Sequence, residues 1–132
     1  MKTLLTIYLL HVFADFTLQG LFGNLKSKFW WMDACNNLKG IVSKKVVYSK
    51  CKRDFMAGLL IHSAYWALIT FFPIWYFCES DVKMLAVLVP NVAIHYFVDD
   101  LKANKLKINL IEDQLIHLGQ IIVTFAAWRI FN

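Results

Sequence analysis

The sequence predicts an all-α protein, an integral membrane bundle of four transmembrane helices that forms a single domain over residues 1–132. Hydrophobic residues make up 59% of the 132 residues, which is more apolar surface than one small soluble core can bury. They are concentrated in four long segments, and about twenty apolar residues are enough to cross the hydrocarbon of a bilayer. We therefore expect the lipid bilayer to be the main partner of the chain. The expected spans cover about residues 3–23, 55–78, 84–101 and 111–131.

The first apolar segment has some features of a cleaved signal peptide, because Lys2 precedes an apolar run. However, His11, Asp15 and Gln19 interrupt that run, and no small-x-small cleavage site follows it. We therefore expect this segment to be a retained helix and the first span of the bundle.

The loop between the first two spans combines aromatic and basic residues. Phe29, Trp30 and Trp31 precede several lysines, a composition typical of a segment that lies in the membrane interface. Pro73 and Pro90 fall within the second and third spans, where proline is tolerated and can kink a helix. We expect an interfacial cytoplasmic segment between helices 1 and 2, and no separate second domain.

The distribution of basic residues predicts the orientation of the spans. Lysine and arginine concentrate in the loop at 24–54 and the turn at 102–110, while Lys2, Lys83 and Arg129 lie on the other side. By the positive-inside rule, both termini face out and the long basic loop is cytoplasmic. Loops beside anionic lipid also account for the net charge of +5, so we exclude nucleic acid as a partner.

The three cysteines, Cys35, Cys51 and Cys78, lack the spacing of a metal-binding motif. Two of them fall in the loop that we place in the cytoplasm, where thiols stay reduced. We therefore expect no disulfide.

The most informative pattern is the placement of histidine and aspartate. Three of the four apolar segments carry a His and an Asp four residues apart, and the remaining segment carries the remaining His. On a helix, residues i and i+4 lie on one face. A charge at the centre of a span costs roughly 2.5–3.5 kcal/mol, so seven ionisable side chains need a compensating purpose. They are His11 with Asp15, His62, His95 with Asp99, and Asp113 with His117.

These seven side chains also gather at similar depths. Counted from the cytoplasmic ends at about 1.5 Å per residue, four of them lie at roughly 9–12 Å, two at roughly 3 Å, and His11 at roughly 18 Å. Scattered polar residues have no reason to gather in the cytoplasmic half, whereas the residues of one site open to the cytoplasm do. The pattern therefore predicts a single site.

Imidazole and carboxylate groups indicate a divalent metal, zinc in the first place and manganese or iron as alternatives. Three buried aspartates also leave negative charge that such cations would neutralise. The set could fill one closed site, or two metals with positions open to water. The expected ligands are His11, Asp15, His62, His95, Asp99, Asp113 and His117, with Asp99 or Asp113 serving as a further ligand or as the catalytic general base. Gln19, Lys102 and Gln114 are expected to orient ligands or to hold an anionic group of the substrate.

Four blocks of the sequence resemble a small bacterial and phage family of integral membrane proteins of unknown function. The blocks are HxxxDFxLQ from His11, a His in the second span, HxxxDxxK from His95 and DQxxH from Asp113. The resemblance covers nearly the whole chain and implies a bacterial inner membrane protein with a shared polar site. Gly58 departs from the family, in which that position often holds another His. A looser resemblance to small membrane proteins described as metal-dependent hydrolases implies hydrolytic chemistry.

These observations favour a metal-dependent hydrolase that acts on a lipid or other amphiphilic substrate, because metal-activated water needs no redox centre. Two alternatives stay open. In a small proton- or ion-coupled transporter, the same carboxylates would carry protons, and four short spans would require an oligomer. In a regulatory or host-interaction membrane protein, the polar cluster would only fix the fold. The sequence does not decide the substrate, the metal or the oligomeric state.

Overall fold

The computed structural model describes residues 2–17, 23–37, 53–77 and 80–131. Within these ranges the chain is helical apart from short turns, and no β-strand is present. The all-α prediction is therefore confirmed for the described part of the chain. Gln19 and most of the basic loop, at 38–52, lie outside the described residues, so the role expected for Gln19 stays a prediction.

The helical elements fall on the four predicted spans and on the loop between the first two. A short π-helix, η1, continues α1, and α6 continues α5 after a turn at Phe71. Pro73 lies in the first turn of α6, where its missing N–H is tolerated, and Pro90 lies inside α7. The elements are α1 (Lys2–Val12), η1 (Phe13–Thr17), α3 (Lys28–Asn37), α5 (Asp54–Thr70), α6 (Phe72–Trp75), α7 (Asp81–Ala103) and α8 (Leu110–Phe131).

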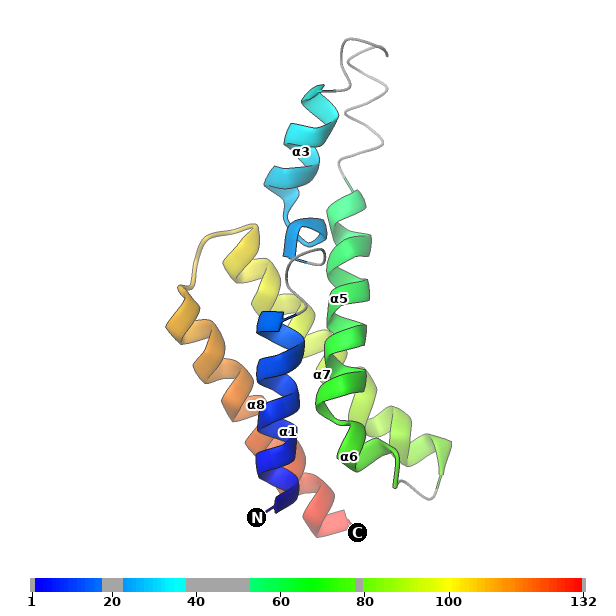
Figure 1. Cartoon of the computed structure of the whole chain (residues 1–132). Helices are drawn as coiled ribbons and strands as arrows, with labels where there is room; N and C mark the ends of the chain where they lie inside the picture. The colour runs from blue at the N-terminus through cyan, green and yellow to red at the C-terminus, as the bar shows by residue number, and fades with distance from the viewer. Residues whose placement is uncertain (1, 18–22, 38–52, 78–79, 132) are drawn as a thin grey trace.

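The long helices run alternately in opposite directions, so that both termini lie at one end of the bundle (Figure 1). α3 and the turn between α7 and α8 lie toward the other end. α7 packs against α5 and α8, and α1 also packs against both of these helices. This arrangement brings residues near the C-terminal end of α7, such as Lys102, beside residues at the start of α8, such as Asp113.

Two of the described helices, α7 and α8, are long and apolar enough to cross a membrane. α7 has 23 residues and α8 has 22, which corresponds to roughly 33–35 Å at 1.5 Å per residue, close to the thickness of the hydrocarbon core. α5 has 17 residues and α1 has 11. Length and composition therefore do not confirm the prediction of four spans.

Large apolar side chains cover the outside of the bundle. Leu60 and Ile61 on α5, Val89 and Phe97 on α7, and Val123 on α8 are each more than half exposed. Among the described residues, buried polar side chains are as numerous as buried hydrophobic ones. An apolar exterior around a polar interior is the reverse of the usual soluble pattern and is compatible with lipid around the helices.

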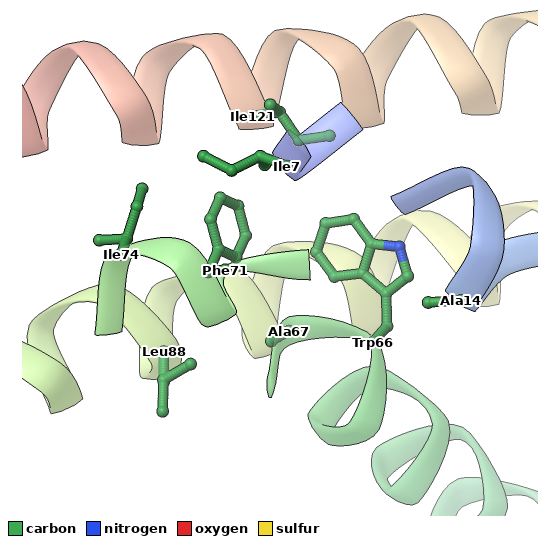
Figure 2. Close-up of a cluster of buried hydrophobic side chains, with 8 residues drawn as sticks. All are labelled: Ile7, Ala14, Trp66, Ala67, Phe71, Ile74, Leu88 and Ile121. Carbon is green, nitrogen blue, oxygen red and sulfur yellow. The ribbon is translucent and has the colours of Figure 1, made fainter. Parts of the chain in front are cut away.

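A cluster of buried hydrophobic side chains from α1, η1, α5, α6, α7 and α8 packs the bundle (Figure 2). Trp66 stands at the boundary between this cluster and the polar site. Its ring stacks on the imidazole of His95, with the centroids 4.0 Å apart and an angle of 13° between the planes. The cluster consists of Ile7, Ala14, Trp66, Ala67, Phe71, Ile74, Leu88 and Ile121.

The expectation that no disulfide forms is wrong. Cys35, near the C-terminal end of α3, is disulfide-bonded. The sequence argument assumed that this loop is cytoplasmic, and disulfides persist mainly in oxidising compartments. The disulfide therefore favours an oxidising compartment for this loop, whereas its lysine-rich composition favours the cytoplasmic side of a membrane.

Gly58 on α5 provides a test of the packing, because it lies directly against the backbone of Leu25. A Cβ atom at Gly58 would lie 2.8 Å from the Leu25 carbonyl carbon and closer still to its oxygen. We predict that Gly58→Ala lowers the free energy of unfolding by about 1–3 kcal/mol, the usual cost of overpacking. Unfolding of the purified protein in detergent measures this loss.

Gly119→Ala on α8 is the matched control, since a Cβ atom there meets nothing within 4 Å. Alanine is the better helix former, so this substitution should be neutral or stabilising. Equal stability of the two variants would contradict the close approach of Leu25 to α5.

Candidate functional site

The seven His and Asp side chains that the sequence singled out lie together between α1, η1, α5, α7 and α8. Each has at most 1% of its surface exposed. The His and Asp of α7 are one turn apart and 3.5 Å from each other, and those of α8 are 3.4 Å apart with the same spacing. The prediction that each i, i+4 pair shares a face is confirmed for these two helices.

The carboxylate of Asp99 lies at the centre of the cluster. Its Oδ2 atom accepts a hydrogen bond from the Lys26 ammonium group at 2.7 Å. The same oxygen lies 3.1 Å from His62 Nε2 and 3.5 Å from His95 Nε2. The two imidazole nitrogens are 3.2 Å from each other. One carboxylate oxygen is therefore shared by an ammonium group and two imidazoles.

Three buried polar atoms of the cluster have no hydrogen-bond partner in the described part of the chain. They are Asp99 Oδ1, Asp113 Oδ1 and His117 Nε2. His117 Nε2 lies 3.4 Å from Asp113 Oδ1 and 3.9 Å from Asp99 Oδ1, so the histidine nitrogen faces both carboxylate oxygens. A buried polar atom without a partner costs about 1–3 kcal/mol. Either a proton on His117, which would pair it with both carboxylates, or a bound cation would satisfy these three atoms.

Each of the two carboxylates beside His117 is held by a lysine through its other oxygen. Lys26 contacts Asp99 Oδ2 at 2.7 Å, and Lys102 donates to Asp113 Oδ2 at 2.6 Å. The Lys26 side chain is 7% exposed and that of Lys102 is 23% exposed. Because the ammonium groups bind the Oδ2 atoms, both Oδ1 atoms are left toward His117.

Gln114 connects the two sides of the cluster. Its amide nitrogen donates to Asp15 Oδ2 at 2.6 Å and to Asp113 Oδ2 at 3.1 Å. Its carbonyl oxygen accepts a hydrogen bond from His11 Nε2 at 3.1 Å. The other ring nitrogen of His11 accepts from the Trp66 indole at 2.9 Å, which places the imidazole proton on Nε2. Both nitrogens of His11 are thus engaged.

Two overlapping groups of three buried side chains have the geometry to hold a metal ion. One consists of Asp15, His62 and His95, and the other of His95, Asp99 and His117, with the ligand atoms of each group within 4.8 Å of one another. Imidazole and carboxylate donors suit zinc, manganese and iron. The donor set therefore fits the predicted divalent metal. His11 and Asp113 belong to neither group.

The structure alters the charge argument made from the sequence. From the sequence, the three aspartates were expected to need metal cations to neutralise them. Lys26 and Lys102 now supply two positive charges in direct contact with Asp99 and Asp113. Charge alone therefore does not require a metal, and the case for one depends on the three unpartnered atoms and the donor geometry.

Sequence reasoning missed two residues of the site. Trp66 lies four residues after His62, so its position on the same helix face was available from the spacing. Lys26 was counted only among the lysines of the basic loop. No sequence signal separates it from them, because the positive-inside rule accounts for a lysine at this place equally well.

A cavity of about 340 Å³ lies between α1, η1 and α8 and reaches the edge of the cluster. His11 and Gln114 form the polar part of its wall, while Phe16, Leu115 and Leu118 are among its apolar lining residues. An apolar chain that carries a polar group at its end would match this distribution.

No family model, curated protein or solved structure matches this chain. The resemblance to the small membrane family therefore stays a prediction, and the function is argued from the site itself.

The two neighbouring aspartates of α7 should respond differently to substitution. Asp99→Asn leaves the Lys26 ammonium buried without its carboxylate, and breaking a buried ion pair typically costs about 3–5 kcal/mol. Asp100 instead pairs at 2.8 Å with Lys105, whose side chain is 51% exposed. Asp100→Asn should therefore cost less than about 1 kcal/mol. Unfolding in detergent compares the two variants, and equal losses would show that Asp99 does not hold the buried network together.

Proposed function

We propose that this protein is an integral membrane metalloprotein that hydrolyses a lipid or other amphiphilic substrate. The observation that carries the proposal is a set of three buried atoms without a hydrogen bond, in which His117 Nε2 faces both Asp99 Oδ1 and Asp113 Oδ1. A divalent metal ion between them would satisfy all three at once. Zinc is the first candidate, followed by manganese and iron.

The contact between His117 and Asp113 suits a metal of that size. Ligand atoms bound to tetrahedral zinc at about 2.0–2.1 Å lie about 3.3 Å from one another, and His117 Nε2 and Asp113 Oδ1 are 3.4 Å apart. The separation of 3.9 Å to Asp99 Oδ1 is somewhat wider. Three protein ligands leave further coordination positions for water or substrate, the arrangement typical of catalytic rather than structural metals.

Hydrolysis is the reaction class that these residues support best. A metal of this kind acts as a Lewis acid that polarises an ester, amide or phosphoester and activates water. Asp99 and Asp113 are the carboxylates next to that position, and each can serve as a ligand or accept a proton as general base. Lys102 and Gln114 fix the outer oxygen of Asp113, which orients the inner one.

An amphiphilic substrate is supported by the surroundings of the site. The cavity between α1, η1 and α8 has apolar walls and presents His11 and Gln114 as its polar groups. The exterior of the helices is apolar, and α7 and α8 have the length of membrane spans. A substrate that partitions into the bilayer could therefore reach the cluster sideways, with its polar end toward Gln114.

A proton relay is the second candidate function, and a chain of three imidazoles favours it. His62 Nε2 faces His95 Nε2 at 3.2 Å, and His95 Nδ1 faces His117 Nδ1 at 3.3 Å. The remaining nitrogen of His117 faces Asp113. A proton could thus enter each of the last two rings at one nitrogen and leave at the other, as in relays through Asp and His chains.

The metal content of the purified protein separates the two functions. We predict about one transition metal ion per chain after purification in detergent, and loss of most of it in His117→Ala, because the only nitrogen of the three-atom group is removed. Asp100→Asn is the control and should keep its metal. Elemental analysis gives the content, and hydrolysis of amphiphilic ester and phosphoester probes gives the activity.

A folded protein that takes up neither zinc, manganese nor iron would overturn the proposal. Proton flux through the metal-free protein in liposomes, abolished by His95→Ala, would then support the relay. Asp113→Asn tests the role of the second carboxylate. If the variant loses both metal and activity, Asp113 is a ligand. If it loses activity but keeps its full metal content, Asp113 is the general base.

The orientation in the inner membrane is part of the proposal and follows from the lysine count. We expect reporter fusions after Asn132 to lie outside and fusions within residues 38–50 to lie in the cytoplasm. The disulfide of Cys35 favours the reverse orientation. A cytoplasmic C-terminus would therefore reject our orientation and place the basic loop on the oxidising side.

A further inference from the structure

Lys26 is a charged residue that the proposed mechanism does not use, although it is buried in the centre of the cluster. Only 7% of its side chain is exposed. Its ammonium group lies 2.7 Å from Asp99 Oδ2 and 3.4 Å from His62 Nε2. Buried lysines are rare and costly unless they are paired, so this placement requires specific support from the rest of the fold.

Several contacts hold the backbone around Lys26 in place. Asn104, at the end of α7, donates to the Lys26 carbonyl oxygen at 3.2 Å and accepts from the Lys28 backbone N–H at 2.6 Å. The indole of Trp31 donates to the carbonyl oxygen of Leu25 at 2.7 Å. Gly58 lets that same Leu25 carbonyl approach α5. Lys26 is therefore directed into the cluster by contacts on both sides of it.

The groups around the ammonium form a second arrangement of donors suited to a metal. His62 Nε2, His95 Nε2 and Asp99 Oδ2 are separated by 3.1, 3.2 and 3.5 Å. These values match the spacing of about 3.3 Å between ligands of a tetrahedral zinc ion. Asp99 thus presents one oxygen to this triangle and the other to His117, as a carboxylate that bridges two cations does.

We propose that the Lys26 ammonium takes the place of a second metal ion in this site. The inference rests on the proposed function, since it assumes a metal between His117, Asp99 and Asp113. The centre then consists of one metal and one fixed ammonium, with Asp99 between them. In hydrolases with two metals about 3.5–4 Å apart, the second cation stabilises charge on the substrate. Lys26 supplies that positive charge without a dissociable ion.

Removal of the ammonium should open the second position. Lys26→Ala leaves His62, His95 and Asp99 without the competing cation, and we expect about two zinc ions per chain in this variant, against about one in the unaltered protein. Lys105→Ala is the matched control. It removes a lysine paired with Asp100, a carboxylate outside the cluster, so the content should stay near one. Lys26→Arg keeps the charge and should also stay near one.

The metal titration is made on full-length protein in detergent, with size-exclusion profiles and thermal midpoints recorded with and without zinc. If Lys26→Ala is unstable without metal, added zinc should restore its thermal midpoint, because the ion replaces the missing charge. A double variant, Lys26→Ala with His117→Ala, should retain about one ion, held by the triangle alone.

The outcomes distinguish this inference from the proposed function. Two zinc ions in the unaltered protein would overturn the role of Lys26, and so would one zinc ion in each of the two proteins. Either result would leave the proposed metal position intact. No zinc in the unaltered protein but one ion in Lys26→Ala would uphold the role of Lys26 in excluding a metal and reject the position at His117. No zinc in either protein would reject both.

Discussion

The carboxylate of Asp99 imposes the main constraint on this structure. It is fully buried, and a buried charge without partners costs several kcal/mol. Its partners come from distant parts of the chain: Lys26 precedes α3, His62 lies on α5, and His117 lies on α8. α5 and α8 must therefore pack against α7 in one register, and the residues before α3 must reach the same point. A shift of α5 or α8 by a turn would remove one of these partners from the buried charge.

Trp66 lies between the apolar cluster and the polar cluster in the interior of the bundle. On one side its ring contacts Phe71 within the apolar cluster, and on the other it stacks on His95 and donates its N–H to His11. An aromatic ring with one polar group suits this boundary, because it buries apolar area while satisfying a buried histidine. The apolar cluster thus stabilises the fold, and the polar cluster determines how the helices align.

The sequence was sufficient to predict that the His and Asp side chains lie together, but not which charged groups contact them. Spacing of four residues placed His95 with Asp99 and Asp113 with His117, because helix geometry is local. The position of Lys26 depends on tertiary contacts from Asn104 and Gly58, which no periodicity encodes. The absence of a histidine at position 58, noted from the sequence as a departure, has its explanation in the Leu25 carbonyl that passes there. The disulfide of Cys35 was missed because reduction was inferred from an assumed orientation.

The charges of the cluster also bear on what it can bind. Asp99 and Asp113 are each in contact with an ammonium group, so with neutral imidazoles these four groups together carry no net charge. A divalent ion at the proposed position would add positive charge to these buried groups. Burial of such a charge is favourable only when an anion accompanies it. An amphiphile with an anionic head, such as a phosphoester, therefore complements the metal-bound site better than a neutral ester does.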